Sequence, residues 1–170
     1  MRTCERAVEL GVPSVVFTEH LDFTAWSVAG KDLDGLDHLR RFIDEGDTLT
    51  PPPLDVEGYL AAIAECRERF PSLDIRTGVE FGQPHRNAAP AASALARGRF
   101  DRVNGSLHCM RVDDLDLEPP GLFRIWPVER VMREYFAELL RMIELGVFDV
   151  LSHILYPLRH WPAGAVPRDT

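Results

Sequence analysis

Several features are absent from this sequence of 170 residues, and each absence excludes a class of protein. No apolar run is long enough to span a membrane, which argues against a transmembrane helix. The three cysteines, Cys4, Cys66 and Cys109, form no Cys-x-x-Cys pair, so neither a disulfide framework nor a zinc ribbon is predicted. No cluster of Lys and Arg is present and the formal charge is −8, so nucleic-acid binding is not favoured.

What remains is the composition of one folded domain. Hydrophobic residues make up 45% of the chain, enough for one buried core. The N-terminus is charged and lacks the apolar segment of a secretory signal, so we expect a soluble, cytoplasmic protein with reduced thiols. Residues 2–10 read as the last turns of a helix without a preceding cap. We therefore expect the sequence to be a fragment of a longer protein, the alternative being a short first helix.

Segments with β-strand and helical patterns alternate along the chain. The predicted strands each end in a polar residue, and the predicted helices follow apolar residues at helical spacing. Alternation of this kind is typical of a parallel sheet, in either a β/α barrel or an open doubly wound sheet. The strands are expected at 15–20, 73–80, 100–108 and 148–153, and the helices at 2–10, 55–70, 88–97 and 127–145.

Two segments are too long for ordinary connections. Residues 22–54 are rich in Asp and Gly, with a short helix expected near 36–43, and residues 110–126 are acidic. Loops of this length usually cover a site or are disordered, so we expect both to lie over the carboxyl ends of the strands.

Four residues that can bind metal ions end the predicted strands: His20, Glu80, His108 and His153. Side chains at the carboxyl ends of parallel strands converge on one face of the fold. Imidazole and carboxylate are the usual ligands of zinc, iron and manganese, and a carboxylate can bridge two ions. Each residue taken singly has a structural alternative, as a satisfied core histidine or a solvent-facing carboxylate. The remaining histidines are expected in loops, solvated or peripheral: His38, His85 and His160.

The motifs around these residues resemble those of a known family. In order along the chain they are Thr18-Glu19-His20, Gly78-Val79-Glu80, Gly105-Ser106-Leu107-His108 and Asp149-Val150-Leu151-Ser152-His153. This order is similar to that of the PHP (polymerase and histidinol phosphatase) domain, particularly its histidinol-phosphatase-like branch.

The resemblance implies a fold, a cofactor and a reaction. The fold is a distorted, TIM-like (β/α)7 barrel with outer helices. Its site holds two or three zinc, iron or manganese ions, and a hydroxide on these metals hydrolyses phosphoesters. By the resemblance Glu80 bridges two ions, His108 and His153 bind one of them, and His20 binds the third. Glu80, His108 and His153 are then the catalytic residues, and a small phosphomonoester is the substrate.

The sequence also departs from the family pattern. The His-x-His and Asp-x-His motifs of the family have no counterpart here, so we expect a single partial PHP domain, an incomplete barrel truncated at both ends, that holds one ion. Such a barrel exposes two sheet edges, through which self-association is expected. Arg159 is a candidate phosphate ligand or a surface arginine, while Asp22 and Glu19 are candidates to orient His20 or are solvated.

Three functions remain open at this point. The first is a histidinol-phosphatase-like phosphomonoesterase. The second is a PHP-type nuclease or another metallohydrolase. The third is a noncatalytic fragment whose histidines are structural.

Overall fold

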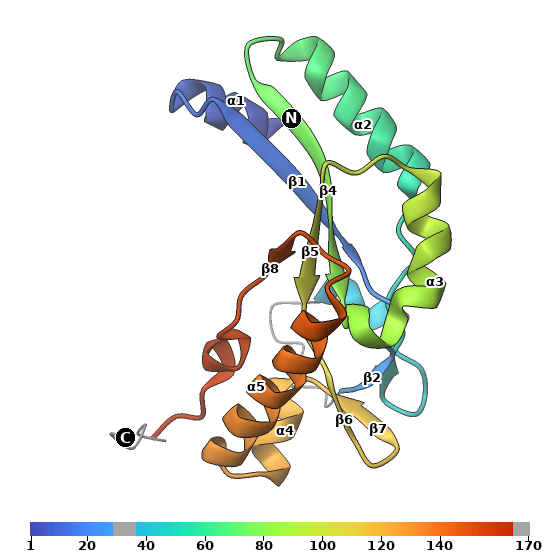
Figure 1. The fold of residues 1–170 in the computed structure, drawn as a ribbon, viewed down its shortest axis with the longest axis vertical. Helices are drawn as coiled ribbons and strands as arrows, with labels where there is room; N and C mark the ends of the chain where they lie inside the picture. Colours follow the sequence, from blue (N-terminus) through green and yellow to red (C-terminus); the bar gives the residue numbers. More distant parts are fainter. Residues whose placement is uncertain (29–36, 165–170) are drawn as a thin grey trace.

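Four parallel strands form the main sheet of the protein (Figure 1). The structure is a computed structural model, and it describes residues 1–28 and 37–164. The strands follow the order β1-β4-β5-β8, so neighbours in the sheet are also consecutive among these strands in the sequence. Their bounds are Ser14–Leu21 for β1, Asp74–Gly82 for β4, Arg102–Ser106 for β5 and Val150–Leu151 for β8.

Helices connect these strands, as the alternating pattern predicted. The helix α1 precedes β1, α2 and α3 flank β4, and α4 and α5 lie between β5 and β8. The bounds are Arg2–Glu9 for α1, Val56–Arg69 for α2, Pro84–Arg97 for α3, Pro119–Ile125 for α4 and Val128–Leu145 for α5. The predicted α/β class with a parallel sheet is therefore confirmed.

Local sequence signals set the ends of two of these helices. The Asp55 carboxylate accepts a hydrogen bond from the Gly58 N–H, which caps the start of α2. Gly146 ends α5 in the left-handed conformation with φ of 65°, which glycine adopts without the penalty of a Cβ. Helix α3 starts at Pro84, earlier than predicted, and has a kink at Asn87. The predicted helix 88–97 is the part after this kink.

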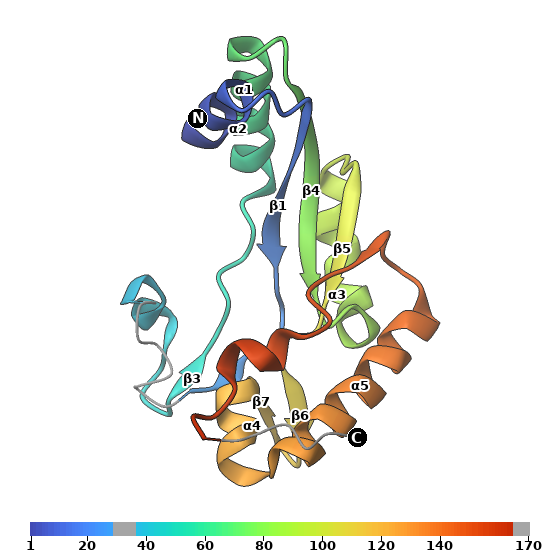
Figure 2. The same ribbon diagram turned by 90° about the vertical axis from the view of Figure 1, so that its left-hand side faces the viewer.

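The helices α1, α2 and α3 pack on one face of the main sheet. Ile75 of β4 packs with Cys4 of α1 and with Ile63 and Cys66 of α2 in one buried cluster. Val79 and Phe81 of the same strand pack with Ala91 of α3 in another. In Figures 1 and 2 the opposite face of the sheet looks into the concave side of the molecule.

A second, smaller sheet occupies segments that were predicted to be loops. Its order is β3-β2-β7-β6, and in both views it lies at the end of the molecule away from α1 and α2. The strand bounds are Trp26–Ser27 for β2, Thr48–Leu49 for β3, Met110–Val112 for β6 and Leu115–Leu117 for β7. The prediction of a loop over 110–126 was wrong, because these residues form the β6–β7 hairpin and α4, which pack against α5.

Residues 22–54 are less regular, and a short 3₁₀ helix, η2, spans Asp37–Phe42. It lies within the short helix predicted near 36–43, of which Leu36 is outside the described residues. A further 3₁₀ helix, η3, spans Tyr156–His160, where no regular element was predicted. None of the helices in the described ranges is both long enough and apolar enough to cross a membrane.

Strand β8 is shorter than the predicted strand 148–153, but its hydrogen bonds to β5 extend further. The Asp149 N–H donates to the Val103 carbonyl and the Ser152 N–H donates to the Gly105 carbonyl. The strands β1 and β8 end the order of the main sheet, so the described strands form an open array. Closure into the predicted (β/α)7 barrel stays a prediction.

Candidate metal centre

The four predicted ligands meet at the carboxyl ends of the main sheet. His20 in β1 is paired in register with Glu80 in β4. His108 follows the end of β5, and His153 follows the end of β8. Because the strands are parallel and adjacent, residues from distant parts of the sequence lie at one edge.

Glu80 is the centre of the group. Its Oε1 atom lies 2.7 Å from Nε2 of His153 and 3.0 Å from Nε2 of His108. The two Nε2 atoms are 3.3 Å apart. The Ser106 hydroxyl also donates to this oxygen, at 2.8 Å. Two imidazole nitrogens and a carboxylate oxygen therefore converge on one point, which is the donor set expected of a site for zinc, manganese or iron.

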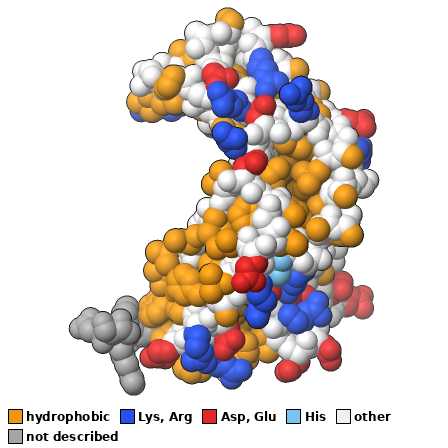
Figure 3. Space-filling view, in the orientation of Figure 1, with side chains coloured by type: hydrophobic (Ala, Val, Ile, Leu, Met, Phe, Trp, Pro, Cys, Tyr) orange, Lys and Arg blue, Asp and Glu red, His pale blue; other side chains and the backbone are white. Residues whose placement is uncertain are grey.

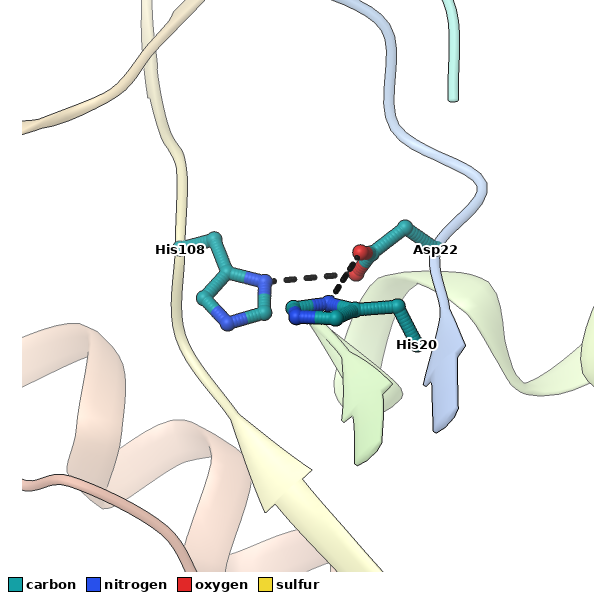
Figure 4. Close-up of side chains that lie close together, drawn as sticks. All are labelled: His20, Asp22 and His108. Carbon is teal, nitrogen blue, oxygen red and sulfur yellow. Dashed lines mark hydrogen bonds and ion pairs between the residues drawn. The ribbon is translucent and has the colours of Figure 1, made fainter. Parts of the chain in front are cut away.

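The fourth predicted ligand, His20, lies beside His108 but belongs to a different group. The two imidazole ring centroids are 5.2 Å apart. The Nδ1 atom of His20 lies 2.8 Å from the Asp22 carboxylate, and its side chain is 65% exposed. His20, Asp22 and His108 form a second set of three residues able to hold an ion (Figure 4).

Mutual hydrogen bonds stabilise the charged forms of these side chains. Burial disfavours the charged form of His108, but hydrogen bonds to Asp22 and Glu80 outweigh burial and raise the pKa of His108 to about 9. Burial likewise opposes ionisation of Glu80, but hydrogen bonds from His108, His153 and Ser106 hold its pKa well below the usual range. The hydrogen bond to Asp22 is the main cause of the raised pKa of His20. The cluster is thus an arrangement of opposite charges, and a cation could replace its protons.

A buried glutamine fixes the backbone at His108. Gln83 follows β4 in the left-handed conformation with φ of 46°. Its backbone N–H donates to the Ser106 carbonyl at 2.8 Å. With its amide oxygen turned toward the end of β5, Gln83 accepts from the N–H groups of His108 and Cys109, at 2.9 and 2.6 Å. The sequence contains no signal that identifies this role.

The candidate ligands open into a cavity of about 520 Å³. Arg159, the predicted phosphate ligand, lies in its wall, as do Glu19, Glu118 and Tyr156. The cavity wall also includes Trp26, Leu39, Leu49 and residues 51–53. Part of the segment 22–54 therefore lines the site, and its place over the carboxyl ends of the strands stays a prediction.

Three histidines were predicted to lie in loops, solvated or peripheral, and of these His38 is exposed. His38 in η2 and His160 in η3 both line the cavity. His85 lies in α3 rather than in a loop, and its Nε2 atom is 2.7 Å from the Glu138 carboxylate of α5. Its side chain is only 11% exposed, so the prediction that it is solvated was wrong. Sequence position alone did not indicate these contacts, because each depends on a distant element.

A comparison with models of known protein families identifies the family to which this chain belongs. The profile of the PHP domain matches residues 1–167, which is almost the whole sequence. The chain belongs to the PHP domain family. No curated protein sequence matches it significantly.

A solved structure supports the same fold. Histidinol phosphate phosphatase from Lactococcus lactis subsp. lactis, crystallised with zinc, L-histidinol and phosphate, is similar to this PHP chain, with a TM-score of 0.66 and 20% sequence identity. The match covers 93% of this chain and 52% of that chain, so the present chain spans about half the length of the relative. At this identity the similarity shows the fold, and it does not show the substrate.

Proposed function

We propose that this chain carries the metal-binding part of a PHP phosphoesterase that hydrolyses small phosphomonoesters in the manner of a histidinol phosphatase. The observation that carries this proposal is the convergence of Nε2 of His108, Nε2 of His153 and Oε1 of Glu80, all within 3.3 Å of one another. Three protein ligands of these types are typical of a catalytic site, which keeps one position for water or substrate.

The roles of the residues follow from the donor set and from the family. Glu80, His108 and His153 would hold one divalent ion, zinc, manganese or iron. His20 would belong to a second position, and Glu80 is the residue suited to bridge. When bound, such an ion polarises phosphate oxygens and lowers the pKa of water.

The protein contributes binding and orientation around this ion. Arg159 is in the wall of the same cavity, and its guanidinium can bind two phosphate oxygens at once. Ser106 donates to the carboxylate oxygen of Glu80 that faces both imidazoles, which restrains the rotation of this carboxylate. The parts of the cavity wall formed by Trp26 and by residues 51–53 would contact the alcohol part of the substrate.

The test combines metal binding with substrate choice. Purified chain is stripped of metal, reloaded with zinc or manganese, and assayed with an aryl phosphomonoester, histidinol phosphate and single-stranded DNA. We expect hydrolysis of a monoester and not of DNA. The variant E80Q, which keeps the size of the side chain but removes its charge, should lower metal affinity and hydrolysis at least about a hundredfold, since loss of a residue that only supports a ligand already lowers them 10–100-fold.

Each other outcome favours a different function. Cleavage of DNA without monoester hydrolysis would support the nuclease alternative, which the net charge of −8 does not favour. Metal binding without either activity would support a noncatalytic chain. Absence of metal binding would exclude the metal centre itself.

A further inference from the structure

Asp22 lies between two histidines of the candidate centre. One of its carboxylate oxygens, Oδ2, is 2.8 Å from Nδ1 of His20, and the other, Oδ1, is 3.2 Å from Nδ1 of His108 (Figure 4). Asp22 directly follows β1, whereas His108 follows β5, so one side chain joins the ends of two strands that are not neighbours in the sheet. The Asp22 side chain is 14% exposed, and hydrogen bonds from His108 and His20 outweigh burial and lower its pKa.

The two nitrogens of His108 face different partners. Nε2 faces Glu80 and His153, while Nδ1 faces Asp22. A neutral imidazole carries one proton, so a ring that binds an ion through Nε2 has its proton on Nδ1. That proton needs an acceptor in a buried place, and the Asp22 carboxylate provides it. A second ion on Nδ1 would require the ring to lose both protons, which argues against Asp22 and His108 sharing an ion of their own.

The absence of a side chain at Gly82 leaves room for the Asp22 carboxylate beside His108. A Cβ atom at Gly82 would overlap Oδ1 of Asp22 and would lie 3.5 Å from Nδ1 of His108. Any side chain at position 82 would therefore displace the carboxylate from the histidine. The glycine at the end of β4 is thus explained by the close approach of Asp22.

We propose that Asp22 is a shared positioning residue, which holds the Nδ1 protons of both His20 and His108 so that both Nε2 atoms are free to bind metal. The Asp22 carboxylate contacts one histidine of each candidate metal position, His20 and His108. A shift of this carboxylate would therefore change the geometry of both positions. The inference rests on the proposed function only in taking these histidines as metal ligands. Carboxylates that orient metal-binding histidines in this way typically change metal affinity 10–100-fold when removed.

The test uses two variants that disturb the same contact by different means. In D22N the amide oxygen can accept from one Nδ1–H, but the amide NH₂ cannot accept from the other. One histidine must then carry its proton on Nε2, where it blocks metal binding. In G82A every polar group is kept and only the carboxylate is displaced. The control D74N removes a carboxylate that bonds to Ser14 and Arg76 at the start of β4, away from the site.

The measurements are zinc affinity and histidine protonation. We expect competition with a chromophoric chelator to show a 10–100-fold loss of zinc affinity in D22N and a loss in the same direction in G82A. Long-range ¹H–¹⁵N spectra of the zinc-loaded protein should show protonated Nδ1 on both His20 and His108 in the wild type and D74N, and on only one of them in D22N.

Other results overturn the inference or separate it from the proposed function. If D22N keeps the zinc affinity and both Nδ1 protons, Asp22 is not a positioning residue, whatever happens to hydrolysis. If the wild type binds no zinc, the proposed function fails. The same spectra of metal-free protein, recorded at a pH where they themselves show a neutral His108 ring, then still decide whether Nδ1 carries the proton. Protons on Nε2 in the wild type would refute the inference there.

Discussion

At the scale of single residues, Tyr59 makes an unusual link between two strands. Its hydroxyl donates to the Phe17 carbonyl of β1 at 2.9 Å and accepts from the Gly78 N–H of β4, also at 2.9 Å. The tyrosine comes from α2, so a helix side chain satisfies two backbone groups of the sheet. The aromatic ring of Tyr59 stacks on Phe100, with 6.2 Å between ring centroids.

We expect Y59F to lower the free energy of unfolding by about 1–3 kcal/mol, because the ring stays packed while two partly buried backbone groups lose their partner. Urea unfolding with an unchanged m-value would measure this loss. A loss below about 0.5 kcal/mol would show that water replaces the hydroxyl and that the link adds little.

At the scale of elements, α3 and α5 are joined by a side-chain hydrogen bond outside the candidate centre. Nε2 of His85 in α3 lies 2.7 Å from Oε1 of Glu138 in α5, and Arg141 donates to the other carboxylate oxygen at 2.8 Å. The hydrogen bond from His85, with a smaller contribution from Arg141, lowers the pKa of Glu138 to about 2 against the opposing effect of burial. The Glu138 side chain is 13% exposed, so solvent screens the pair only in part.

This pair predicts a dependence of stability on pH. A carboxyl whose pKa is depressed in the folded state stabilises the fold above its unfolded pKa of about 4.5. The contribution is lost as the pH falls from about 4.5 toward 2. We expect E138Q to lower the free energy of unfolding by about 1–3 kcal/mol at pH 7, and the difference from the wild type to shrink below pH 4.5.

Urea titrations between pH 7 and pH 3 would check this prediction. The control is E134Q on the same helix, since Glu134 pairs only with the exposed Arg133 among the contacts described for its side chain. It should change stability by less than about 0.5 kcal/mol at each pH. A difference between E138Q and wild type that stays constant with pH would contradict the depressed pKa.

At the scale of the whole molecule, the open sheet is the dominant feature. The strands β1 and β8 end the order of the main sheet, and hydrophobic side chains gather on the concave side of the molecule (Figure 3). The exposed hydrophobic residues include Val16 of β1, Val150 of β8, and Ile154 and Leu155 just beyond it. An edge strand with free backbone groups and exposed apolar neighbours is a template for pairing with another chain.

We therefore predict that the isolated chain self-associates as its concentration rises. Lysine on an edge strand opposes such pairing, so V16K should weaken the association about tenfold, or ~1.4 kcal/mol. Sedimentation velocity over a range of concentrations would measure it. The matched control is V8K, at an equally exposed valine of α1 outside the sheet; Val8 is 45% and Val16 is 41% exposed. A chain that remains monomeric at all concentrations would refute the prediction.

The extent to which the fold could be predicted differs between its two sheets. The main sheet was predicted because β1, β4 and β5 are apolar runs between helices with clear ends, such as the Asp55 cap and Gly146. The β6–β7 hairpin was missed because its strands are three residues long and its sequence is acidic, and α4 was missed because it has only seven residues. Such short strands are held by packing against α5 more than by local preference.

The sequence by itself determined the family, the α/β class and the identity of the polar residues at the strand ends, because those features depend on local pattern and on the order of motifs. Only the tertiary structure decided which atoms of these residues contact one another. In the folded protein Asp22 lies between His20 and His108, and Gln83 accepts a hydrogen bond from the backbone N–H of His108. The His85 side chain is largely buried. These contacts depend on strand register and on close approaches such as that at Gly82, which no local pattern encodes.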